Sequence, residues 1–111
     1  MRSVEDTRPR PGLSVPVITA LDESGALVDE DQRAVVRHVI QDGYGADVVF
    51  AAGTTGEWDR IEPKVQRRVI QICAEEVAKA NAALPPGQGR DVEAWAGITA
   101  RTPKDLSLIH I

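Results

Sequence analysis

The chain has 111 residues, of which 42% are hydrophobic and 27% are charged, and its formal net charge is -4. This length suits one small domain and is too short for two. The acidic balance gives no reason to expect nucleic acid or an anionic membrane as a partner, because both attract an excess of basic residues. The longest apolar run, Val48 to Ala52, is far shorter than the roughly 20 residues that span a bilayer.

The first eleven residues and the rare residue types narrow the class further. Residues 1–11 mix charges with two prolines and have no apolar core, so we expect a flexible leader rather than a secretory signal peptide. Cys73 is the only cysteine, which excludes an internal disulfide and favours a cytoplasmic location. It continues an apolar helical stripe, so we expect a buried core residue. His38 and His110 are the only histidines, and we expect neither a metal nor another cofactor.

Hydrophobic patterning predicts alternating strands and helices. Strands are expected near residues 13–19, 47–52 and 92–97, and helices near 30–42 and 62–80. Asp29 and Gln32 have the spacing of a capping box, Gly43 suits a helix C-terminus, and Pro63 suits a first helical turn. Repeated strand–helix units predict an α/β fold with a parallel sheet and right-handed crossovers. An open doubly wound sheet and a closed eight-stranded barrel both begin in this way.

The loop Gly53-Thr54-Thr55-Gly56-Glu57 directly follows the second expected strand, at the edge of the sheet where α/β proteins build sites. Its glycines would allow positive φ angles and a close approach to a ligand. Two hydroxyls and the intervening N–H groups offer several donors to a small carboxylate with an adjacent keto oxygen. The spacing matches neither a phosphate loop nor a dinucleotide motif. Such a loop is also a common strand-to-helix turn, and its spacing alone names no reaction.

Four motifs occur in the order and spacing of a known enzyme family. They are Gly12 to Leu21, Val28-Asp29, Gly53 to Glu57, and Ala96-Gly97 with Thr102. They resemble the G-x-x-x-A-x-V-T-P-F strand, the V-D helix start, the G-T-T-G-E loop and the A-G-x-G-A-x-x-T segment of the dihydrodipicolinate synthase and N-acetylneuraminate lyase family. Ala20-Leu21 replaces the family's Pro-Phe, and Ile98-Thr99 replaces a glycine-containing turn. Both departures lie near the mouth of the expected barrel and bear on the substrate.

The resemblance implies a (β/α)₈ TIM barrel, of which residues 12–105 would be the first three βα units. A whole barrel needs roughly 250 residues. Family members form a Schiff base between a lysine and pyruvate, and the imine then acts as an electron sink for making or breaking carbon–carbon bonds. The implied activity is that of a 4-hydroxy-tetrahydrodipicolinate synthase of lysine biosynthesis. The alternative within the family is an aldolase for N-acetylneuraminate or keto-deoxy sugar acids, and either parent would be a homotetramer.

The resemblance also assigns roles within the loop. By motif position, Thr54 would be catalytic, using its hydroxyl in a proton relay with tyrosines. Thr55 would bind the carboxylate of pyruvate or of another 2-keto acid. Gly53 and Gly56 would complete the substrate-binding loop by shaping its backbone, and Glu57 would support the fold.

The Schiff-base lysine and the relay tyrosines come from later strands in this family. The lysines of this chain occur on or beside the expected helices, at Lys64, Lys79 and Lys104, and Tyr44 precedes the second strand on the opposite rim. We therefore expect a fragment without aldolase activity. We also expect the inward faces of Val15, Val17, Val49 and their neighbours to lack the strands that would cover them.

The C-terminal residues contradict their local signals. Residues 102–105 predict the cap of a third helix, yet residues 106–111 are apolar and alternate as in a strand. These six residues also resemble the in-frame translation of a common transposase sequencing adapter. We expect 106–111 to be non-native, which resequencing of the locus tests. Two other classes stay open: a non-catalytic domain that binds an anion at the 53–57 loop, and an open flavodoxin-like domain with a nucleotide site.

Overall fold

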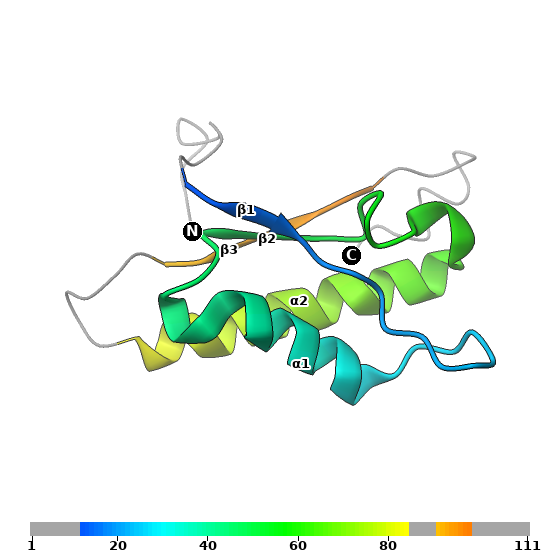
Figure 1. Cartoon of the computed structure of the whole chain (residues 1–111), viewed down its shortest axis with the longest axis horizontal. Coiled ribbons are helices and arrows are strands. Elements are labelled where there is room, and N and C mark those ends of the chain that lie inside the picture. The colour runs from blue at the N-terminus through cyan, green and yellow to red at the C-terminus, as the bar shows by residue number, and fades with distance from the viewer. Residues whose placement is uncertain (1–11, 85–90, 99–111) are drawn as a thin grey trace.

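A computed structural model describes residues 12–84 and 91–98 of the chain. The elements in order are β1 (Ser14–Pro16), α1 (Asp29–Ile40), η2 (Gln41–Gly43), β2 (Val48–Ala51), η3 (Trp58–Arg60), α2 (Pro63–Ala83) and β3 (Glu93–Ala96). The strands form one parallel sheet in the order β1-β2-β3, which confirms the predicted α/β architecture. Both helices lie against one face of this sheet (Figure 1). The expected leader, third helix and C-terminal tail fall outside the described residues.

The strand register decides which side chains meet the helices. Val15 pairs with Val49, and the neighbouring row joins Pro16, Phe50 and Trp95 across the sheet. Because successive strand residues point to opposite faces, the two rows lie on opposite faces. Val49 is fully buried in the core with residues of both helices, namely Val36, Ile40, Val69, Cys73 and Val77.

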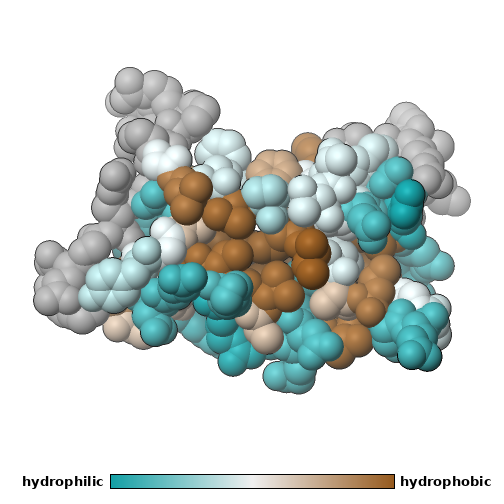
Figure 2. All heavy atoms as spheres, viewed as in Figure 1, coloured by the Kyte–Doolittle hydropathy of each residue, from teal (hydrophilic) through white to brown (hydrophobic). Residues whose placement is uncertain are grey.

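The expectation that the faces of Val15, Val17 and Val49 lack cover is therefore wrong, because the helices cover them. Val17 is only 2% exposed and belongs to the same core, while Val15 packs against it. The row of Pro16, Phe50 and Trp95 lies on the opposite face, where Trp95 is 36% exposed. Apolar side chains also gather over the seam between strands and helices in the view of Figure 2.

Helix α1 begins without the predicted capping box. Its N-cap is Val28, no side chain caps it, and Asp29 lies in the first turn. Gln32 is fully buried instead. Its side-chain amide forms hydrogen bonds with the backbone after β1, not with the end of the helix. The α-helix ends at Ile40, before the predicted Gly43, because Gln41 adopts a left-handed conformation with a φ of 48°.

Helix α2 begins with Pro63 at its first turn, as predicted, and extends to Ala83, past the expected end near residue 80. Asn81, beyond the expected end of the helix, is therefore helical. Its side-chain amide donates to the Val92 carbonyl at 2.9 Å and accepts from the Val92 N–H at 2.8 Å, which ties the end of α2 to the start of β3. In the described part of the chain, no helix is long and apolar enough to cross a membrane.

Candidate functional site

The loop after β2 lies at the C-terminal edge of the sheet, as predicted. Because the three strands are parallel, the residues that follow them share this edge, and they include Thr19 and Gly97. The loop closes on itself through two backbone hydrogen bonds. The N–H of Glu57 donates to the Thr54 carbonyl at 3.0 Å, and the N–H of Trp58 donates to the Gly53 carbonyl at 3.4 Å.

The loop glycines serve close packing rather than positive φ angles, which corrects the prediction. The left-handed residues are Ala52 and Glu57, with φ angles of 57° and 58°. A Cβ atom on Gly53 would lie 2.5 Å from a ring carbon of Phe50. One on Gly56 would lie 3.2 Å from the Val17 carbonyl oxygen. Both glycines are buried, so larger side chains would push the loop away from the sheet.

The end of β3 supports the loop from the other side. The N–H of Gly97 donates to the Ala51 carbonyl at 2.8 Å. A Cβ atom on Gly97 would lie 2.4 Å from the carbonyl oxygen of Ala52 and 3.3 Å from the Cα of Gly53. The loop thus rests directly on the backbone of β3, and only glycine fits at position 97 without a shift.

Thr19 ties the loop to the segment after β1. It is 8% exposed, and its hydroxyl donates to the Gly56 carbonyl at 2.6 Å. Gln32 holds the backbone on both sides of Thr19, because its amide accepts from the Ala20 N–H at 2.7 Å and donates to the Ile18 carbonyl at 3.0 Å. Together these bonds fix the loop from β1 and from α1.

A second buried glutamine holds the far end of the loop. The amide of Gln66 is 2% exposed and donates to the Trp58 carbonyl at 3.1 Å. The sequence interpretation missed Gln66 and gave Gln32 a different role, in a capping box. A signal existed, because Gln32 lies four residues before Val36 and Gln66 lies three before Val69, on the buried faces of their helices. A polar residue in an apolar stripe indicates a buried hydrogen-bonding partner.

The two threonines are left exposed on this fixed loop. Thr54 and Thr55 are exposed, while the glycines beside them are buried. The only side-chain hydrogen bond to the 53–56 segment that the described residues show comes from Thr19. The hydroxyls of Thr54 and Thr55 can therefore donate to or accept from a bound molecule without breaking an intramolecular bond.

The tyrosine and the two described lysines lie where the sequence analysis expected them, outside the loop. Tyr44 is 86% exposed and precedes β2, so it lies at the opposite end of the sheet from the loop. Lys64 and Lys79 lie in α2, with side chains 83% and 68% exposed. Lys104 lies outside the described residues.

Cys73 is buried, as predicted. Burial raises the pKa of its thiol to about 12, so it stays protonated and is a poor nucleophile. Over residues 12–84 and 91–98, no group of three or more acidic, histidine or cysteine side chains could hold a metal ion.

Fold and loop together point to one family of enzymes. Residues 10–90 match the family model of the dihydrodipicolinate synthetase family, so the chain belongs to this family of aldolases. A 4-hydroxy-tetrahydrodipicolinate synthase from Syntrophotalea carbinolica is 34% identical over 68 residues, which are 61% of this chain and 22% of the relative. The chain thus spans less than a quarter of that relative.

Solved structures support the fold. The N-acetylneuraminate lyase of Mycoplasma synoviae superposes with a TM-score of 0.65 at 22% identity, over 86% of this chain and 29% of the other. The chloride-inhibited dihydrodipicolinate synthase of Acinetobacter baumannii, complexed with pyruvate, gives a TM-score of 0.64 at 21% identity, over 87% of this chain and 29% of the other. At these identities the likeness concerns the fold, which is part of a TIM barrel.

Proposed function

We propose that the chain is part of an aldolase that forms a Schiff base with pyruvate and joins it to an aldehyde, as a 4-hydroxy-tetrahydrodipicolinate synthase does. The observation that carries this proposal is the pair of exposed hydroxyls, Thr54 and Thr55, on a loop fixed at the C-terminal rim of a parallel sheet. The name of the Syntrophotalea carbinolica relative, a 4-hydroxy-tetrahydrodipicolinate synthase at 34% identity, supports the same reaction.

Within this proposal the two threonines have different tasks. Thr55 donates its hydroxyl to the pyruvate carboxylate, and Thr54 passes protons to and from the reacting atoms together with tyrosines from later strands. The Schiff-base lysine would come from a later strand, as the family resemblance implies, and Lys64 and Lys79 lie on α2 rather than at the end of a strand. The chain alone would therefore bind pyruvate weakly without reacting. The cytoplasmic location and tetrameric state of the whole enzyme belong to the same proposal.

The named relatives support one branch of the family over the other. The similarity that extends to sequence is to a 4-hydroxy-tetrahydrodipicolinate synthase, at 34% identity. The similarity to an N-acetylneuraminate lyase stands at 22% identity and concerns the fold alone. We therefore favour condensation of pyruvate with an aldehyde over cleavage of sialic or keto-deoxy sugar acids.

Pyruvate titration followed by amide NMR tests the proposal. We expect saturable shifts at residues 53–57, a strong reduction in Thr55→Val, and retention in Thr55→Ser, which keeps the hydroxyl. Lys64→Gln removes an exposed charge in the first turn of α2 without touching the loop hydroxyls, and serves as the charge control. Borohydride added to the pyruvate complex should leave the mass of the chain unchanged. Shifts that persist in Thr55→Val would contradict the role assigned to Thr55. A trapped pyruvyl adduct would contradict the proposal that the Schiff-base lysine comes from a later strand.

A further inference from the structure

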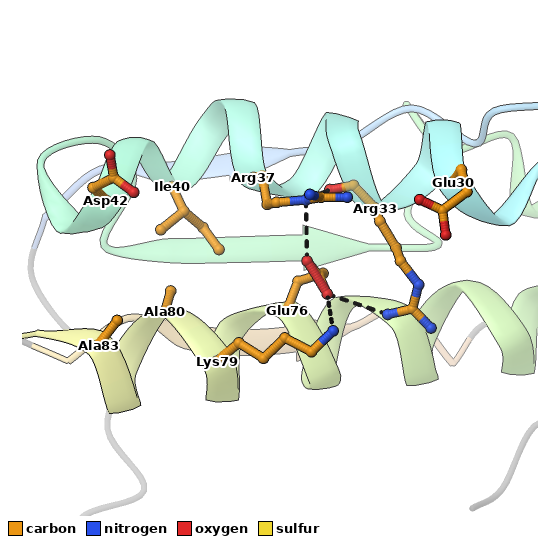
Figure 3. A pocket seen from close by; sticks show the side chains of 9 residues that line it. All are labelled: Glu30, Arg33, Arg37, Ile40, Asp42, Glu76, Lys79, Ala80 and Ala83. Atoms are coloured by element: carbon orange, nitrogen blue, oxygen red, sulfur yellow. Dashed lines mark hydrogen bonds and ion pairs between the residues drawn. The ribbon is translucent and has the colours of Figure 1, made fainter.

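A second polar site lies between the two helices, away from the rim. A groove of about 680 Å³ runs between α1 and α2, and its central side chains are Arg33, Arg37, Glu76 and Lys79 (Figure 3). Glu30 and Asp42 lie toward its two ends. The proposed function of the 53–57 loop involves none of these residues.

A buried carboxylate organises the groove. Glu76 is only 4% exposed and is bonded by three cations: Arg37 at 3.1 Å, Arg33 at 3.2 Å and Lys79 at 3.0 Å. Burial acts to raise the pKa of Glu76, but hydrogen bonds from Lys79 and Arg33 outweigh it, and the pKa is lowered. The carboxylate is therefore ionised at neutral pH and holds the three cations close together.

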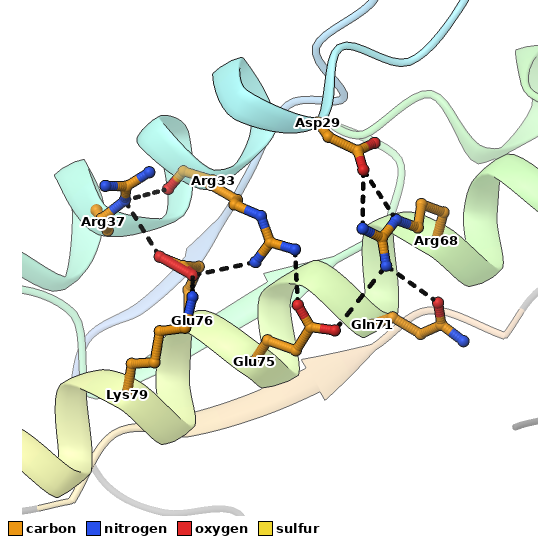
Figure 4. A network of polar contacts seen from close by, with 8 residues as sticks. All are labelled: Asp29, Arg33, Arg37, Arg68, Gln71, Glu75, Glu76 and Lys79. Carbon is orange, nitrogen blue, oxygen red and sulfur yellow. Dashed lines mark hydrogen bonds and ion pairs between the residues drawn. The ribbon is translucent and has the colours of Figure 1, made fainter.

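At the centre of the groove three cations, Arg33, Arg37 and Lys79, meet two carboxylates, Glu75 and Glu76. Arg33 also pairs with Glu75 at 2.7 Å, and Glu75 lies 3.9 Å from Arg68 (Figure 4). With Arg33 shared between two carboxylates, Arg37 and Lys79 both depend on Glu76. Two exposed cations thus face one carboxylate.

The donors of these two cations are only partly used. Arg37 bonds through its Nε, to Glu76 at 3.1 Å and to the Arg33 carbonyl at 3.3 Å. Within the described chain its two terminal nitrogens have no recorded hydrogen bond, and Lys79 uses one of its three donors. The side chains are 58% and 68% exposed, so a solute can reach them. A guanidinium edge beside an ammonium suits a tetrahedral oxyanion.

We propose that this groove binds one compact oxyanion, a phosphate group, between the terminal nitrogens of Arg37 and the ammonium of Lys79. Glu30 and Asp42 at the ends repel an extended polyanion, so the site selects a single phosphate over a nucleic-acid strand. The proposal concerns only residues of α1, α2 and the turn after α1. It holds or fails independently of pyruvate binding at the 53–57 loop.

Titration of the full chain with inorganic phosphate at constant ionic strength and pH tests this, with amide NMR of Arg37, Lys79 and Ala80 as the readout. We expect saturable shifts, and in Lys79→Gln an affinity at least tenfold lower. The Lys79 side chain is 68% exposed, and Glu76 keeps Arg33 and Arg37 as partners, so the variant should still fold. Lys64→Gln removes the same charge elsewhere on α2 and should bind phosphate as the unmodified chain does.

A second pair of variants separates charge from geometry. Arg37→Lys keeps a cation but loses the two terminal nitrogens, and should weaken phosphate binding as much as Arg37→Gln does. Shifts that do not saturate, or that are equal in Lys79→Gln and Lys64→Gln, would overturn the proposal. So would equal shifts with a short single-stranded oligonucleotide at the same phosphate concentration.

Discussion

The two faces of the small parallel sheet are built from alternate residues of the same strands, yet they differ in what covers them. The face toward α1 and α2 buries Val17 and Val49 to 2% and 0% exposure. The opposite face presents Pro16, Phe50 and Trp95 in one row, with Trp95 36% exposed. The covered face holds the described part of the fold together, and the other face is the side on which a closed barrel places its interior.

Removing core volume from the covered face should have the largest effect. Ile40 is 2% exposed in the core, and Ile40→Ala should reduce the free energy of unfolding by about 2–5 kcal/mol. Ile98→Ala makes the same change at a residue that is 62% exposed and should cost far less. Chemical denaturation of both variants measures the difference. Equal losses would mean that the covered face is not the main source of stability.

Neutralising Glu76 should have the next largest effect on the free energy of unfolding. Glu76→Gln leaves Arg33, Arg37 and Lys79 facing a neutral group, and should cost about 1–3 kcal/mol. The lowered pKa of Glu76 predicts a pH dependence. Its contribution is present above the ordinary pKa of 4.5 and is lost as the pH falls through the lower folded value.

Denaturation of the unmodified chain and of Glu76→Gln across acidic pH measures this dependence. The difference between the two should shrink as the pH falls below 4.5. A difference that stays constant over that range would show that ionisation of Glu76 does not contribute.

Loss of the Thr19 hydroxyl should have a smaller effect. Thr19→Val leaves the Gly56 carbonyl without its 2.6 Å hydrogen bond, at a cost of about 1 kcal/mol. Thr19→Ser keeps the hydroxyl and provides the control. Amide hydrogen exchange should show the loss at Glu57 and Trp58 first, since their loop bonds depend on the same backbone. Unchanged exchange at these two amides would contradict a role for Thr19 in fixing the loop.

The smallest change is expected on the open face. Trp95→Ala should reduce the free energy of unfolding less than Ile40→Ala does, because Trp95 is already 36% exposed to solvent whereas Ile40 is 2% exposed. A loss as large as that of Ile40→Ala would show that this face is covered in solution.

The sequence predicted what depends on local signals. The apolar run at 48–51 and Pro63 correctly located β2 and the start of α2. Order along the chain, combined with parallel pairing, correctly put the 53–57 loop on the rim with Thr19 and Gly97. The roles proposed for Thr54 and Thr55 are still predictions.

The features that the sequence did not predict correctly depend on tertiary contacts. Gln32 has the spacing of a capping residue, but its amide bonds to the chain after β1, and no local pattern encodes that partner. The spacing of Gly53 and Gly56 suggested positive φ angles. Instead, the Phe50 ring of β2 and the Val17 carbonyl after β1 leave little room for a Cβ atom at these two positions. Alternation within β1 and β2 allowed either face to meet the helices, and the interpretation chose the wrong one.

Pro16 has a consequence for the outer edge of β1. The N–H of Val17 donates toward β2, to the Phe50 carbonyl at 3.0 Å, so the nitrogen of Pro16 points the other way. Proline has no hydrogen to offer there. A strand that pairs with this edge, whether from another molecule or as the last strand of a closed barrel, finds no backbone N–H at Pro16 to bond with. The edge is thereby discouraged from adding strands at random, which is a common protection against aggregation.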